Sequence, residues 1–196
     1  MAEYRTYAVG AGKINPRGVR SIVQAVKEKS GFRLNDKLAE FYAVPGNGIP
    51  DCSVLEEAAK LENTAVIIIT RGSGENIDNR PDKGEYYLSD EEEKLISKVS
   101  TVFEKTVAVL NIGYPIDVRR IDKYGIDAAV YTGFGGMFAS EALMGILDGS
   151  INPSGRLPDT FALDYYDIPS SKNFLNFKND EPVLQTDYPA YSDICY

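Results

Sequence analysis

Apolar residues in the first part of the chain recur at intervals of three and four, the spacing of one helix face. The first such stripe consists of Val19, Ile22, Val23 and Val26. Asn15 followed by Pro16 predicts its N-terminus, and Gly31 predicts its end. A short helix is predicted over residues 36–42, and a capping box of Ser53 with Glu56 predicts another.

Continuous apolar runs, the first of them β-branched, then predict three strands, at residues 65–69, 107–110 and 128–131. Such runs are apolar on both faces, as in a sheet covered by helices on both sides. A helix capped by Ser89 and Glu92 lies between the first two runs, and residues 139–147 form a helix after the third. Strand, helix and strand repeated at this spacing predict an α/β sandwich, with a mostly parallel sheet and helices on both faces.

The periodic pattern ends near residue 163. Residues 164–196 are rich in Tyr, Phe, Pro, Asn and Asp and show no periodicity. We therefore predict a domain over residues 1–163 and an extended aromatic tail or linker over residues 164–196. The total of 196 residues fits one domain with such an appendage.

Composition excludes several function classes. The 21 Lys and Arg against 29 Asp and Glu give a net charge of −8, which argues against a nucleic-acid partner. No apolar run approaches the roughly 18 residues of a transmembrane helix, and the first residues lack the layout of a secretory signal. The absence of histidine excludes a His-containing triad or a His-ligated metal within this chain. Cys52 and Cys195 show no metal-ligand spacing, so we expect no metal, and a disulfide between them is an alternative without support in the sequence. We also expect no cofactor. The lack of disulfide spacing weakly favours the cytoplasm.

Glycine-containing loops follow all three predicted strands, at residues 71–80, 111–115 and 132–136. In a parallel sheet these loops gather at the carboxyl ends of the strands, where ligands bind. The sequence matches neither of the two common nucleotide-binding motifs in full. Tyr7 and Ile14 break the phosphate-loop pattern around Gly10–Lys13, and Ile77 replaces the third glycine of the dinucleotide pattern.

Glu75 is the candidate for chemistry, because its glycine-flanked loop follows a buried strand. The alternative is an exposed loop glutamate or an ion-pair partner of Arg71 or Arg80. Asp78 and Arg80 favour a structural pair that shapes the loop. Ser73 has no base within this chain, so it is a poor nucleophile.

Residues 64–161 resemble the second, α/β-sandwich domain of glycoside hydrolase family 3, the β-glucosidase and β-xylosidase group. The segments that carry the resemblance are 71–75 with Asp78 and Arg80, then 83–90, 109–116 and, most specifically, 149–161.

The resemblance implies that Glu75 is the general acid/base of a retaining β-glycosidase that acts on terminal β-glucosides or oligosaccharides. The nucleophile of this family is an aspartate on a separate (β/α)8-type barrel. A barrel of about 250 residues cannot fit here beside the sandwich, so we expect half of an active site. We assign Arg71, Ser73, Asp78 and Arg80 as candidate substrate-binding residues.

Two features depart from the family pattern. Gly136 is followed by Met137 and Phe138, where the family commonly has Gly-Gln-Glu, which puts the substrate contacts of this loop in doubt. We also expect the chain to begin just after the apolar strand that usually opens the domain. A sheet without its first strand exposes an edge, which favours a homodimer. The alternatives to the enzyme are a non-catalytic carbohydrate-binding or interaction module and a purely structural domain.

Overall fold

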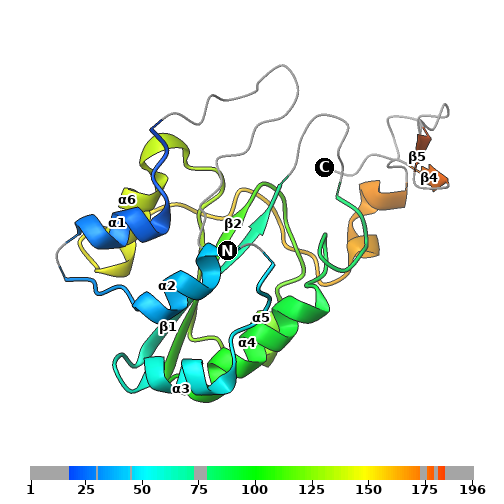
Figure 1. The fold of residues 1–196 in the computed structure, drawn as a ribbon. Coiled ribbons are helices and arrows are strands. Elements are labelled where there is room, and N and C mark those ends of the chain that lie inside the picture. Colours follow the sequence, from blue (N-terminus) through cyan, green and yellow to red (C-terminus); the bar gives the residue numbers. More distant parts are fainter. Residues whose placement is uncertain are drawn as a thin grey trace.

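The computed structural model of the chain describes residues 18–29, 31–44, 46–72, 79–172, 176–178 and 181–183. Within these residues, a three-stranded parallel sheet lies between helices (Figure 1). The strands stand side by side in chain order: β1 (Thr64–Arg71), β2 (Lys105–Ile112) and β3 (Ala128–Tyr131). The structure confirms the predicted α/β class and the parallel sheet.

Helices cover both faces of this sheet (Figure 1). One face is packed by α1 (Ile22–Glu28) and α6 (Ala139–Leu147). The opposite face is packed by α2 (Asp36–Ala43), α3 (Cys52–Ala59), α4 (Asp90–Val102) and α5 (Arg119–Lys123). The short α5 was not predicted, because its five residues are too few to show an apolar period.

Strand β2 separates two apolar cores. Ala108, Leu110 and Ile112 belong to the larger core beneath α3 and α4. Val109 points the other way, is 0% exposed and belongs to the core beneath α1 and α6. A shift of one residue would exchange these two sets of side chains, so their burial fixes the register in which Leu110 pairs with Ile69.

The first helix begins later than its apolar stripe predicts. Ser21 caps α1: its Oγ accepts the Gln24 N–H at 3.1 Å, and its own N–H donates to Gln24 Oε1 at 2.9 Å. Gly18 has a φ of 82°, a left-handed conformation that a right-handed helix cannot include. Val19 therefore precedes the helix, and the predicted start at residues 15–16 lies outside the described residues.

One of the two later capping boxes is correct. Ser89 Oγ accepts the Glu92 N–H at 3.1 Å and Glu92 Oε2 accepts the Ser89 N–H at 2.8 Å, which confirms the cap of α4. The box of Ser53 with Glu56 is wrong. The extended residue before α3 is Asp51, whose side chain makes no capping bond, so Ser53 already lies inside the first turn.

The segment predicted as a tail contains short elements: η3 (Tyr165–Asp167), η4 (Pro169–Lys172) and the antiparallel strands β4 (Asn176–Lys178) and β5 (Glu181–Val183). Its beginning contacts the domain, because the Tyr165 ring packs edge-on against Tyr86 with 5.4 Å between centroids. The boundary at residue 163 stays a prediction.

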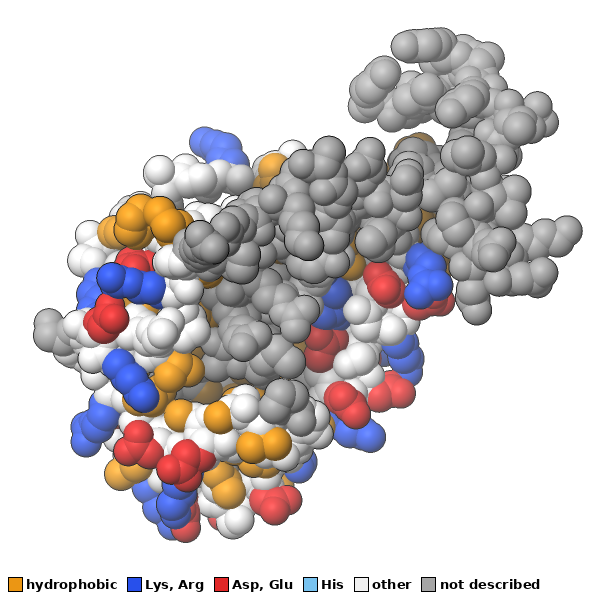
Figure 2. All heavy atoms as spheres, turned by 45° about the horizontal axis from the view of Figure 1, so that its top comes forward, with side chains coloured by type: hydrophobic (Ala, Val, Ile, Leu, Met, Phe, Trp, Pro, Cys, Tyr) orange, Lys and Arg blue, Asp and Glu red, His pale blue; other side chains and the backbone are white. Residues whose placement is uncertain are grey.

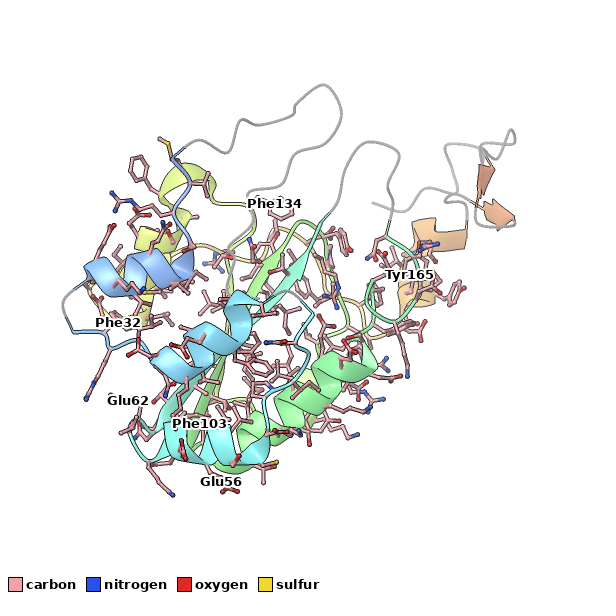
Figure 3. The ribbon with its side chains drawn as sticks, viewed as in Figure 1. Phe32, Glu56, Glu62, Phe103, Phe134 and Tyr165 are labelled. Carbon is pink, nitrogen blue, oxygen red and sulfur yellow. The ribbon has the colours of Figure 1, made fainter. Side chains whose placement is uncertain are left out.

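A cavity of about 950 Å³ lies along the outer edge of β1, between α1, α2 and α3. Most of its lining is apolar, including Val23, Leu38 and Val66, and Figure 3 shows Phe32 and Phe103 in this part of the molecule. No strand among the described residues pairs with this edge. The missing first strand and the homodimer both stay predictions.

The visible surface carries charges of both signs. In Figure 2, basic and acidic side chains alternate over the described part of this face, with apolar side chains between them. None of the helices in the described ranges is both long and apolar enough to cross a bilayer.

The larger core should respond strongly to truncation at Ile96, which is 1% exposed on α4. We expect Ile96→Ala to lower the free energy of unfolding by about 2–5 kcal/mol, because it removes buried methyl groups and leaves a cavity. Leu61→Ala, at a site 64% exposed, should change it by less than about 0.5 kcal/mol. Urea unfolding of this chain measures both, and equal losses would contradict the assigned core.

The ends of α1 and α6 are joined by an ion pair that should be pH-dependent. Lys29 Nζ lies 2.6 Å from Asp148 Oδ2, and the hydrogen bond from Lys29, then those from Ser150, lower the pKa of Asp148 to about 2. A folded-state pKa below the unfolded one stabilises the fold above about pH 4, and this contribution disappears as the pH falls towards about 2. We expect the melting temperature of Asp148→Asn to fall less over this range than that of the wild type. If the melting temperatures of the two proteins fall equally over this pH range, the ion pair contributes nothing to stability.

Candidate functional site

The loops after the three parallel strands meet at one end of the sheet, where ligand sites of such sheets lie. Figure 3 shows Phe134, from the loop after β3, and Tyr165 at this end of the molecule. Glu62 and Phe103 lie at the opposite end, beside the start of β1 and the end of α4. Arg71 is the last residue of β1, so the start of the predicted loop lies at this end of the sheet.

The structure describes two of the five predicted site residues. Arg71 and Arg80 flank the loop and are described, whereas Ser73, Glu75 and Asp78 lie outside the described residues. The site is therefore built from the two stems of this loop and from the neighbouring loops that contact them.

Arg71 forms the first stem. It is the last residue of β1 and only 6% exposed. Its Nη1 and Nη2 donate to Glu92 Oε1 and Oε2, both at 2.6 Å. Its Nε donates to the Glu85 carbonyl at 3.0 Å, and Nη1 also donates to the Thr70 carbonyl at 3.1 Å. A two-pronged ion pair with further hydrogen bonds is the arrangement that makes a buried guanidinium tolerable.

Glu92 is fixed as firmly as Arg71. It lies in the first turn of α4, where its carboxylate also accepts the Ser89 N–H. The positive end of the helix dipole favours a carboxylate at this place. The ion pair thus joins the end of β1 to the start of α4.

Arg80, on the far side of the loop, lies near two carboxylates. Its Nε is 3.5 Å from Asp82 Oδ2, and its Nη2 is 4.0 Å from Glu85 Oε1. Glu85 Oε2 also accepts a hydrogen bond from the Tyr114 hydroxyl at 3.3 Å. Burial, and then the charge of Glu85, raise the pKa of Tyr114 to about 12, so this hydroxyl remains a donor at neutral pH.

Asn79 forms the second stem. Its side-chain amide donates to the Pro115 carbonyl at 3.2 Å, and its own carbonyl accepts the Tyr165 hydroxyl at 3.1 Å. The ring contact of Tyr165 with Tyr86 holds that hydroxyl in place. Both ends of the loop are consequently anchored to the folded domain.

Two buried polar residues beside these stems were missed by sequence reasoning. Asn111 is 0% exposed and donates to the Gly133 carbonyl at 2.7 Å, which links the loops after β2 and β3. Asp117 is 4% exposed and accepts from Arg119 Nε and Nη2, both at 2.9 Å. The sequence signal that could have identified Asn111 is its position, as a polar residue directly after an apolar strand run.

The described polar side chains of this site are carboxylates, guanidinium groups, hydroxyls and amides, and the chain contains no histidine. Within the described ranges, no group of three or more residues could hold a metal ion. The loop whose two stems are described here includes Glu75 in its sequence, and a carboxyl group is a side chain that can supply or accept a proton.

Comparison with known proteins gives one family match over nearly the whole chain. A sequence model described as "Glycosyl hydrolase family 3 C-terminal domain" matches residues 2–193. The chain is 35% identical to a β-glucosidase of Ruminococcus albus, over 88% of this chain and 20% of that protein. It is 28% identical to thermostable β-glucosidase B of Acetivibrio thermocellus, over 90% of this chain and 23% of that protein.

Solved structures agree with these matches. β-Glucosidase 3B from Thermotoga neapolitana, in complex with glucose, superimposes with a TM-score of 0.77 and 32% identity, over 84% of this chain and 26% of that one. A β-glucosidase from Paenibacillus barengoltzii gives a TM-score of 0.79 and 27% identity, over 87% and 21%. The chain thus spans about a fifth to a quarter of each of these four proteins.

Proposed function

The chain belongs to the family of glycosyl hydrolase family 3 C-terminal domains, and from this premise we propose that it is the acid/base-bearing domain of a retaining β-glycosidase. The substrates proposed are terminal β-D-glucosides, because the relatives reported above are named β-glucosidases. The remainder of the active site, with its nucleophile, would lie on a barrel domain outside this chain. The family match over residues 2–193 is the observation that carries the proposal.

In the proposed reaction, Glu75 acts twice. It first protonates the glycosidic oxygen while the nucleophilic carboxylate of the barrel attacks the anomeric carbon and forms a glycosyl-enzyme. It then takes a proton from the water that hydrolyses this intermediate. Retaining hydrolysis requires the two carboxyl groups to lie about 5–5.5 Å apart.

The first step needs a protonated Glu75, and the charges around its loop are compatible with this. A cation close to a carboxyl group lowers its pKa and would oppose protonation. Arg71, four residues before Glu75, is neutralised by Glu92. Burial of the loop against the barrel would raise the pKa of Glu75, as in other general acids of this kind.

The remaining loop residues have proposed roles in substrate binding. Arg80, on the second stem, combines a guanidinium with partial exposure of its side chain, 37%. Ser73 and Asp78 offer a hydroxyl and a carboxylate for sugar hydroxyl groups. These three assignments rest on their places in the loop.

A non-catalytic carbohydrate-binding module is the second candidate. It is favoured by Met137 and Phe138, which are 48% and 67% exposed where the family pattern commonly has Gln and Glu. An exposed aromatic ring can stack on a sugar face. Sugar binding that survives Glu75→Ala, without activity in the full-length protein, would favour this candidate.

We expect the isolated 196-residue chain to hydrolyse no aryl β-glucoside above the background rate, because it would contain one carboxyl group of the required pair. Release of nitrophenol from nitrophenyl β-D-glucoside measures this. Turnover that disappears in Glu75→Gln would mean that the chain holds a complete active site.

In the full-length enzyme, the effect of Glu75→Gln should depend on the leaving group. Phenyl β-D-glucoside needs a general acid, so we expect kcat/KM for it to fall by about 10²–10⁴-fold. Dinitrophenyl β-D-glucoside releases a stable anion that needs no proton, so its glycosylation step should change far less. Steady-state and burst kinetics with both substrates separate the two effects.

Glu91→Gln is the matched control, because Glu91 is an exposed glutamate in the first turn of α4. It should leave both rates unchanged. Equal losses for the two leaving groups in Glu75→Gln would contradict the general-acid role.

A further inference from the structure

The buried ion pair of Arg71 and Glu92 lies where the loop that carries Glu75 leaves the sheet. Arg71 is the final residue of β1 and pairs in register with Ile112 of β2. One residue later, at Gly72, the chain leaves the strand. The side chain of Arg71 therefore fixes the last point at which the loop is attached to the sheet.

The guanidinium of Arg71 is directed at protein acceptors. A guanidinium has five N–H donors, and four hydrogen bonds of Arg71 reach described oxygens of Thr70, Glu85 and Glu92. The residue is also 6% exposed. Arg71 is thus buried and its guanidinium is held by protein oxygens, whereas a substrate ligand has to be accessible from a cleft.

The acceptors of Arg71 come from three different parts of the site. Glu92 belongs to α4, Thr70 to β1, and Glu85 to the segment that follows the loop. The Glu85 carboxylate in turn contacts Tyr114 from the loop after β2. The side chain of Arg71 thus connects the strand, the helix and the segment after the loop, and Glu85 joins this segment to the loop after β2.

We infer that Arg71 is a positioning residue that holds the loop of Glu75 by its two-pronged pair with Glu92, and that it does not contact the substrate. This inference rests on the proposed function of Glu75. It replaces the substrate-binding role that the sequence suggested for Arg71.

The expected effect is on the chemical step. Glu75 lies four residues beyond Arg71, so a shift of the stem is passed along the backbone to the acid/base. A misplacement of about 1 Å can reduce a rate about 100-fold. Lysine can supply the charge at this position but not the fork that matches both oxygens of Glu92.

The test uses the full-length enzyme and phenyl β-D-glucoside, whose leaving group needs the general acid. Arg71→Met should lower kcat about 100-fold with KM within about twofold of the wild type. The kcat of Arg71→Lys should be about tenfold higher than that of Arg71→Met. A KM that rises tenfold or more at unchanged kcat would overturn the inference and make Arg71 a substrate ligand.

A second variant separates positioning from folding. Arg71→Met alone leaves Glu92 without its cation, which is destabilising, whereas Arg71→Met with Glu92→Gln removes both charges and keeps an acceptor for the Ser89 N–H. The double variant should melt near the wild-type temperature and still have a low kcat. A wild-type kcat in the folded double variant would overturn the inference.

Lys83→Met is the matched control, because Lys83 forms an exposed ion pair with Asp90 at the start of the same helix. It should change neither kcat nor KM. The Glu75→Gln variant, measured alongside, keeps the two proposals distinguishable. If Glu75→Gln retains full activity, the proposed function fails; if only Arg71→Met retains it, the positioning role fails.

Discussion

Burial of β2 between two helix layers is the constraint on which the rest of this structure depends. Val109 faces one core and Leu110 the other, so the strand has one register in which both are covered. That register places the ends of β1 and β2 side by side, with Arg71 opposite Ile112. The loops of the site begin from this shared edge.

The same arrangement explains how a charged residue can lie inside the domain. Arg71 ends β1, and its side chain reaches the N-terminus of α4. There Glu92 already belongs to the capping box of the helix. The Glu92 carboxylate, which caps α4, is thereby also the ion-pair partner of the buried Arg71. Stability and function meet here, because the pair that allows Arg71 to be buried also fixes one end of the loop.

The sequence predicted what is local or periodic. The apolar runs located the three strands of the parallel sheet but neither β4 nor β5, and the capping box of Ser89 located the start of α4. The start of α1 was misplaced, because the positive φ at Gly18 is not visible in an apolar stripe. The site contacts were missed for another reason: Arg71 meets Glu92 across 21 residues, and Tyr165 meets Asn79 across 86. Contacts between residues so far apart depend on the topology of the fold, and the local spacing of residues does not predict them.

The most direct test of the account is the separation of two carboxyl groups in a crystal structure of the full-length enzyme, trapped as its fluoroglucosyl intermediate. The trapped sugar identifies the nucleophile, and the distance from that carboxyl group to Glu75 is then measured. We predict about 5–5.5 Å, as retaining hydrolysis requires. A Glu75 carboxyl group more than about 9.5 Å away, beyond the range of either hydrolytic geometry, would contradict the assignment of this chain as the acid/base domain.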